Sequence, residues 1–318
     1  MERAMIEIEQ ILSQEYGLEM KKICPMTTGV GGKTFSLDTQ KGKYLCKIAD
    51  SNAMNHPKEE PDICTFLRER KIPATSFLRT RKGELTTVYK GNVLHVQRFV
   101  EGKTFAQNQA PDWYMEETPA LLGKMHTALL EYRELPEGIG RDFFEYMTPE
   151  SVYTSYCRSI ERAKTEGDEG ILNDLNIRLH TLEKMKNWKF DITRLTCRNT
   201  HGDYTVNQII CGEHKINAVI DFTSACRHPV IWEITRSFYL AEPTCKNGEL
   251  CEDKFKEYVY RYESEATLNK YDKDNLLRLY YYQLAVCDYY AQYFDAENSR
   301  KAEYLQQAKF ATAILKNL

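Results

Sequence analysis

Two aspartates lie at the ends of a short predicted hairpin in residues 200–223, THGDYTVNQIICGEHKINAVIDFT. Residues 208–211 and 216–220 are mostly apolar and predict two short strands joined by a tight turn. Asp203 precedes the first strand and Asp221 ends the second. Because the loop before a hairpin's first strand lies beside the end of its second, we expect both carboxylates at one rim.

An amide from Asn207 or Gln208 would lie between these two carboxylates. Carboxylate and amide oxygens suit Mg²⁺, and a carboxylate facing a hydroxyl can serve as the base in phosphoryl transfer. The alternative is a structural hairpin whose acids cap turns. The order of acid, amide, strand and acid favours a site.

A glycine-rich turn near the N-terminus also suits phosphate chemistry. Gly29, Gly31 and Gly32 lie between residues 23–28 and 34–38, which read as antiparallel strands. Such a turn lets backbone N–H groups approach phosphates, although an ordinary hairpin turn has the same composition. The G-x-x-x-x-G-K-[ST] pattern of a Walker A loop is absent, and no helix follows directly.

Lys47 lies in the next predicted strand, residues 43–49. Strand alternation puts it on the same face as Leu45 and Ala49, which favours an inward position over a solvent-facing one. An inward lysine would reach the α- and β-phosphates of a nucleotide.

An acid that could pair with Lys47 begins the next predicted helix, residues 57–70. Glu59 and Glu60 both lie in its first turn, and the spacing to Leu67 selects Glu60. The alternative is a solvated acidic turn favoured by the helix dipole.

The order of HGD, an amide, a strand and Ile-Asp-Phe resembles the aminoglycoside phosphotransferase and choline kinase family, in which the pattern is HGDxxxxN followed by IDF or IDW. The resemblance implies that Asp203 is the catalytic-loop aspartate and that Asp221 binds the metal. The fifth residue after Asp203 is Gln208. Gln208 is therefore predicted as the second Mg²⁺ ligand, with Asn207 as the alternative. Lys47 and the glycine turn would position the phosphates, as the third-strand lysine of kinases does.

The resemblance also implies an α+β, bilobal protein-kinase-like fold with a small antiparallel-sheet lobe and a larger, mainly helical lobe. The stretch VLHVQRFVEGKTF resembles the hinge of this group, where backbone groups near Gln97 and Phe99 would meet the adenine edge. We expect a nucleotide-binding lobe at residues 1–100. A helical lobe with the catalytic loop and the substrate site is expected at residues 101–318.

Further helices are expected in the second lobe, including one that starts near Pro229 and others over residues 112–132, 148–165, 167–188, 250–266 and 272–316. Glu233 is expected to brace the catalytic loop, and His126 to be a satisfied packing residue. The aromatic run 280–294, with Asp288 in it, would either line a cation site or pack on itself, and packing is the more frequent outcome.

Composition narrows the class of protein. The chain has 318 residues, enough for two lobes, and its net charge of −3 argues against a nucleic-acid partner. Ten cysteines without a C-x-x-C pair predict a reduced, cytoplasmic protein. The N-terminus is charged and amphipathic, and no apolar run approaches about 18 residues, so neither a signal peptide nor a membrane partner is expected.

The function expected from these features is that of a small-molecule kinase. It would move the γ-phosphoryl group of ATP, or of GTP, to a hydroxyl of an amino alcohol or an aminoglycoside, with Mg²⁺ as its metal. The alternative is a non-catalytic kinase-like binding or spore-coat protein. A protein kinase is disfavoured because Asp-Phe-Thr replaces Asp-Phe-Gly and no Ala-Pro-Glu follows. The sequence leaves the oligomeric state open.

Overall fold

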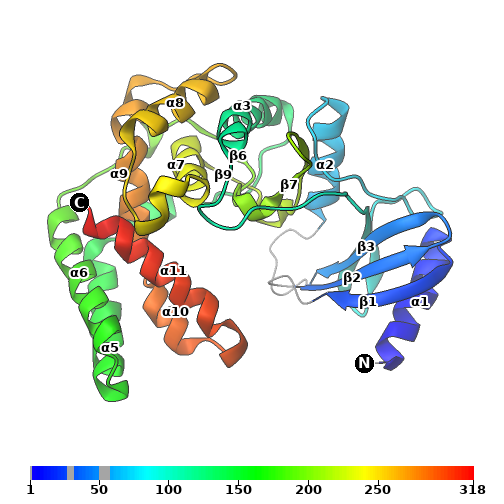
Figure 1. Ribbon diagram of the computed structural model, residues 1–318, viewed down its shortest axis with the longest axis horizontal. Helices are drawn as coiled ribbons and strands as arrows, with labels where there is room; N and C mark the ends of the chain where they lie inside the picture. The colour runs from blue at the N-terminus through cyan, green and yellow to red at the C-terminus, as the bar shows by residue number, and fades with distance from the viewer. Residues whose placement is uncertain (1, 27–31, 50–57) are drawn as a thin grey trace. The chain divides into compact units, whose positions relative to one another are not determined.

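The chain folds into two compact units in the computed structural model, which describes residues 2–26, 32–49 and 58–318 (Figure 1). The first unit comprises residues 1–104 and 207–225, and the second comprises residues 105–206 and 226–318. The expected lobe boundary near residue 100 stays a prediction. A single boundary does not describe the two units, because the chain returns to the first unit for residues 207–225.

The first unit is built on a five-stranded antiparallel sheet in the order β1-β2-β3-β5-β4. Its strands are β1 (Met20–Met26), β2 (Gly32–Thr39), β3 (Gly42–Ala49), β4 (Thr87–Tyr89) and β5 (Asn92–Arg98). In β3, Tyr44, Cys46 and Ile48 are buried on one face, as strand alternation requires. Leu45 and Lys47 therefore point to the opposite face.

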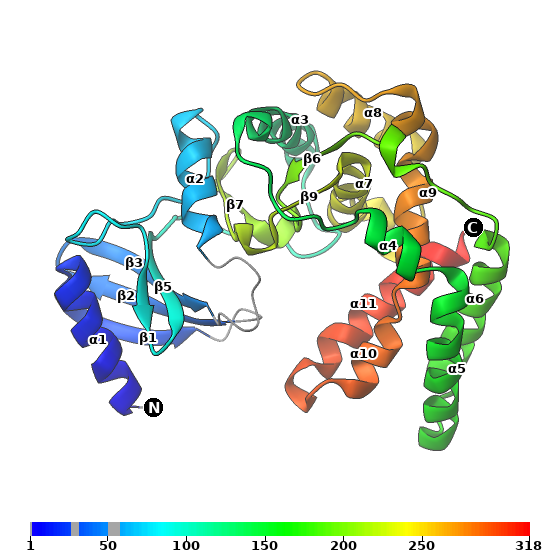
Figure 2. The same cartoon turned by 180° about the vertical axis from the view of Figure 1, so that it is seen from behind.

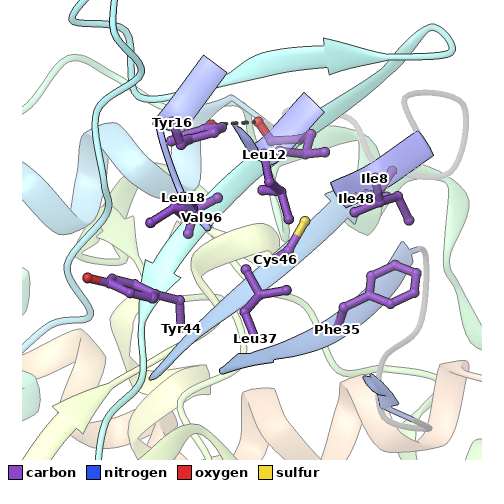
Figure 3. Close-up of a cluster of buried hydrophobic side chains, with 11 residues drawn as sticks. Ile8, Leu12, Tyr16, Leu18, Phe35, Leu37, Tyr44, Cys46, Ile48 and Val96 are labelled. Atoms are coloured by element: carbon purple, nitrogen blue, oxygen red, sulfur yellow. Dashed lines mark hydrogen bonds between the residues drawn. The ribbon is translucent and has the colours of Figure 1, made fainter. Parts of the chain in front are cut away.

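Helix α1 (Glu2–Tyr16) covers the face that carries Cys46 (Figures 1 and 3). It presents Ile8, Leu12 and Tyr16 at intervals of four residues, so all three lie on one side of the helix. The Tyr16 hydroxyl donates to the Leu94 carbonyl at 3.4 Å. Full burial of each such aliphatic side chain contributes about 1.5–3 kcal/mol, and this core fixes which face of the sheet is left for Lys47.

The predicted hairpin is present as β7 (Ile209–Cys211) and β8 (Ile216–Val219), which pair antiparallel in the first unit. Lys103 exchanges two backbone hydrogen bonds with Cys211, at 2.8 and 2.9 Å. This pairing explains why residue 102 is a glycine. Its φ is +135°, and a Cβ at this position would collide with the Cys211 carbonyl oxygen. On its other side the hairpin joins the segment after helix α2 (Glu59–Glu69), where the Val219 N–H donates to the Pro73 carbonyl at 2.7 Å.

The second unit is mainly helical, and Figure 2 shows α5 and α6 packed side by side. Its helices are α3 (Asp112–Ala128), α4 (Arg141–Tyr146), α5 (Pro149–Glu166), α6 (Glu169–Met185), α7 (Val230–Ala241), α8 (Glu252–Glu263), α9 (Lys270–Val286), α10 (Tyr289–Asp295) and α11 (Asn298–Lys316). Two short strands, β6 (Cys197–Thr200) and β9 (Cys226–Pro229), pair antiparallel at the ends of the segment that crosses to the first unit. None of the helices in the described part of the chain is long and apolar enough to cross a membrane.

One feature of this unit differs from expectation. The segment 272–316 was expected to be helical throughout, whereas it contains breaks that separate α9, α10 and α11. Asp288 causes one of them, because its carboxylate accepts the Ala291 N–H at 2.9 Å and so caps the start of α10. The same carboxylate accepts the hydroxyls of Ser155 and Ser159, at 2.7 and 3.1 Å. These contacts favour the packing interpretation of Asp288 over a cation site.

Candidate active site

Lys47 forms ion pairs with two acids of the first unit. Its Nζ lies 3.3 Å from Glu60 Oε2 and 2.7 Å from Asp221 Oδ1. Only 13% of the Lys47 side chain is exposed, as the inward prediction required. The first turn of α2 therefore supplies the expected partner, and the end of the β7–β8 hairpin supplies a second one.

Glu60 is a buried carboxylate that stays ionised. Burial alone would raise the pKa of Glu60, but the charge of Lys47 and the contact with His95 outweigh it and hold this pKa at about 2. His95 lies opposite Lys47 in the β3–β5 register, and its Nε2 is 3.3 Å from Glu60 Oε2. Burial would likewise lower the pKa of Lys47, but Glu60 and Asp221 raise it above its ordinary value. The lysine therefore stays charged.

Asp221 adopts a backbone conformation that few non-glycine residues take. Its φ is +62° and its ψ is +61°, a left-handed conformation that costs about 1–2 kcal/mol for most side chains and less for aspartate. The Thr223 hydroxyl donates to Asp221 Oδ1 at 2.7 Å. The Ile220 N–H donates to the Gln208 carbonyl at 2.9 Å, so Gln208 and Asp221 begin at the same rim of the hairpin. Asn207 is exposed there.

The HGD loop, which contains Asp203, lies in the second unit and is held by buried groups. The Asp203 N–H donates to His201 Nδ1 at 3.2 Å. Glu233, on α7, accepts the backbone N–H groups of His201 and Tyr204, at 3.3 and 3.4 Å. These contacts confirm that Glu233 braces the loop.

His126 completes this support. Its Nε2 lies 2.9 Å from Glu233 Oε2, and its Nδ1 lies 2.9 Å from the Tyr262 hydroxyl. An ionised carboxylate can only accept, so Nε2 carries a proton and donates it to Glu233. Burial alone would raise the pKa of Glu233, but His126 outweighs it, and the pKa is held at about 2. His126 is thus a satisfied packing residue, as predicted.

Sequence reasoning missed the ion pair of Asp203 itself. Nη1 of Arg236, also on α7, lies 2.6 Å from Asp203 Oδ1. The sequence held one signal, since Arg236 follows Glu233 by three residues and so lies on the same side of a helix. His95 was missed too, because only its place opposite Lys47 in the sheet reveals it.

The remaining predicted residues have different outcomes. Gly29 and Gly31 lie outside the described residues. Gly32 opens β2 opposite Ala49, and a Cβ there would lie 2.7 Å from the Ile48 carbonyl oxygen, so a close strand contact requires this glycine. Gln97 is buried in β5, and the Phe99 N–H donates to the Lys43 carbonyl at 3.2 Å. The adenine contacts near these two residues stay a prediction.

The predicted residues divide between the two units. Lys47, Glu60, Gln208 and Asp221 belong to the first unit, and Asp203 belongs to the second. The expected closeness of Asp203 to Asp221 relates one unit to the other and stays a prediction. A hollow of about 330 Å³ in the first unit, lined by residues of α2 and the segment 76–85, contains none of these side chains.

Residues 22–247 match the phosphotransferase enzyme family, a range that includes both groups of residues. The chain belongs to this family. It is accordingly a phosphotransferase of the kinase type with a hydroxyl group as acceptor. No curated protein sequence matches the chain significantly.

Solved structures of similar fold include an amicoumacin kinase in complex with AMP-PNP and Ca²⁺. It has a TM-score of 0.68 at 13% identity, over 96% of this chain and 92% of that one. A spectinomycin phosphotransferase in complex with ADP and spectinomycin has a TM-score of 0.67 at 13% identity, over 98% of this chain and 97% of that one. The GDP complex of an aminoglycoside 2′-phosphotransferase has a TM-score of 0.62 at 13% identity, over 97% of this chain and 98% of that one. These likenesses confirm the predicted α+β kinase-like fold, with an antiparallel-sheet lobe and a mainly helical lobe.

Proposed function

We propose that the protein is a small-molecule kinase that transfers the γ-phosphoryl group of ATP or GTP to a hydroxyl of its substrate. The observation that carries this proposal is the pairing of Lys47 with both Glu60 and Asp221. In kinases, a strand lysine held by a helix glutamate contacts the nucleotide phosphates, and an aspartate beside it holds the metal. Membership of the phosphotransferase family supports the same activity.

Asp221 and Gln208 are the residues that we assign to Mg²⁺. Both side chains offer oxygen ligands and begin at one rim of the hairpin, and 34% of the Asp221 side chain is exposed. One or two protein oxygens would suffice to hold Mg²⁺, since nucleotide phosphates and water would supply its other ligands. When bound, Mg²⁺ would offset the charge of the phosphates. Asn207 remains the alternative ligand.

Asp203 is the residue that we assign to the acceptor hydroxyl. As the hydroxyl oxygen bonds to the γ-phosphorus, the bond from phosphorus to the bridging oxygen breaks, and the hydroxyl proton passes to the carboxylate. The support of the HGD loop by His201 and Glu233 favours this role, because both fix the backbone beside Asp203. Little proton chemistry is needed beyond this transfer.

For the acceptor we propose an amino alcohol, an aminoglycoside or a related antibiotic. The similar structures are named for amicoumacin, spectinomycin and aminoglycosides, and two of them hold adenine nucleotides while the third holds GDP. We place the protein in the cytoplasm, because all ten cysteines are free.

Two conservative variants test the assignments separately. Nucleotide with Mg²⁺ at about 100 times Kd should stabilise the wild type by about 2.7 kcal/mol in a thermal-shift assay. Asp221→Asn should lose the Mg²⁺-dependent part of this stabilisation. Asp203→Asn should keep it and lose about 10²–10⁴-fold in phosphotransfer rate. Asp253→Asn, at an exposed position on α8, serves as the control and should change neither measurement.

A wild type that binds neither nucleotide and turns none over would refute the kinase proposal. The remaining interpretation would then be a non-catalytic binding or coat protein with a kinase-like fold. Full activity in Asp203→Asn would refute the assignment of the acceptor site alone.

A further inference from the structure

Arg236 and Asp203 form a half-buried ion pair within the second unit. The side chains are 25% and 30% exposed, so the pair meets solvent on one side. Burial would lower the pKa of Arg236, but Asp203 raises it above its ordinary value. The cation beside the carboxylate is therefore permanent.

The surroundings of Arg236 hold its guanidinium in place. Its Cζ lies 5.4 Å from the centre of the Trp232 ring, a cation–π contact one turn earlier on α7. The Trp232 indole N–H in turn donates to Gln283 Oε1 on α9, at 3.2 Å. A side chain fixed in this way can fix the orientation of the carboxylate that it binds.

Two backbone N–H groups of the loop have a hydrogen-bond partner other than Arg236. Glu233 already accepts the N–H groups of His201 and Tyr204, and it does so from the same helix. The two α7 residues thus act on different parts of the loop, Glu233 on its backbone and Arg236 on the Asp203 side chain.

We propose that Arg236 is a positioning residue for phosphotransfer, which holds the Asp203 carboxylate in the orientation that receives the acceptor hydroxyl. This inference rests on the proposed function of Asp203. A purely structural ion pair at this exposure would contribute little to stability and nothing specific to turnover. A positioning residue has the opposite signature, because a shift of about 1 Å in a catalytic group costs on the order of 10²-fold in rate.

The test compares Arg236→Gln and Arg236→Lys with wild type in nucleotide turnover with Mg²⁺, using spectinomycin, an aminoglycoside and water alone as acceptors. We expect kcat to fall about 10²-fold in Arg236→Gln, with the nucleotide KM unchanged, and to recover partly in Arg236→Lys, which keeps the charge. Guanidinium at millimolar concentration should restore part of the activity of Arg236→Ala. Arg261→Gln is the matched control, since Arg261 forms an ion pair 2.7 Å long with Glu257 on α8 and is 37% exposed.

The outcomes are distinguishable. An active wild type with an unchanged kcat in folded Arg236→Gln refutes the inference alone. Equal losses of kcat in Arg236→Gln and Arg261→Gln also refute it, since they indicate a general effect of charge loss. A wild type without turnover on any acceptor refutes the proposed function and this inference with it.

Discussion

Replacing Glu60 by glutamine removes the charge that holds Lys47 and keeps nearly the same side-chain volume. Glu60 is fully buried, and its pKa of about 2 lies below the ordinary value of 4.5. At about 1.4 kcal/mol per pKa unit, this difference corresponds to about 3 kcal/mol of stability. This loss of stability falls within the range of about 3–5 kcal/mol that is typical for breaking a buried ion pair.

The dependence on pH has a definite sign. A carboxyl whose pKa is lower in the folded protein contributes fully above its unfolded value, and the contribution is lost as the pH falls through the folded value. The contribution of Glu60 to the free energy of unfolding should therefore be complete above about pH 5. It should disappear as the pH falls from about 4.5 to about 2. Glu60→Gln should lack this component, so its stability should differ from that of the wild type most at neutral pH.

Thermal unfolding at pH 7, 5 and 4 measures both effects. In a chain of 318 residues, a loss of about 3 kcal/mol should lower Tm by about 4–5 °C. Glu69→Gln, on the exposed side of the same helix, is the control and should lie within about 2 °C of wild type. A Tm for Glu60→Gln within about 2 °C of wild type at pH 7 would refute the claim that an ionised Glu60 stabilises the Lys47 cluster.

Two further predictions concern the loop brace and the hairpin. Glu233→Gln should lower kcat by at least about tenfold with less effect on the nucleotide KM, because the N–H groups of His201 and Tyr204 lose a charged acceptor. Steady-state kinetics measures both constants, and equal changes in kcat and KM would contradict the prediction. Gly102→Ala should destabilise the protein by more than about 2 kcal/mol in urea unfolding, because the new Cβ meets the Cys211 carbonyl at a positive φ. Gly83→Ala is its control, since Gly83 also has a positive φ but open space around it, and an equal loss there would indicate backbone strain alone.

Local pattern was sufficient to predict the contact between two residues of the sheet unit, Lys47 and Glu60. Strand alternation placed Lys47 on the same face as Leu45 in an inward position, and helix spacing selected Glu60, because both arguments depend only on near neighbours in the chain. The hairpin was predictable for the same reason, since its two strands are separated by a short turn. The left-handed backbone of Asp221 was not, because it arises where the hairpin meets the following turn.

Contacts between distant segments explain what was missed. Arg236 reaches Asp203 across 33 residues, and His95 reaches Glu60 only through the order of strands in the sheet. Strands β6 and β9 are four residues each and stabilise one another across the segment that joins the first unit, so neither has a strong pattern of its own. The break at Asp288 had a local signal that the prediction of one helix over residues 272–316 did not use, namely an aspartate suited to cap a helix.

The return of the chain to the first unit at residues 207–225 bears on how the protein is made. The backbone pairs of Lys103 with Cys211 and of Pro73 with Val219 each close a loop of more than 100 residues. A ribosome must therefore synthesise residues 105–206 of the second unit before the first can be completed, and closing such long loops slows folding. A fragment that stops at residue 104 would lack the hairpin and expose the edge that it covers. Expression of a nucleotide-binding half by itself would thus require residues 207–225 to be joined to it by a designed linker.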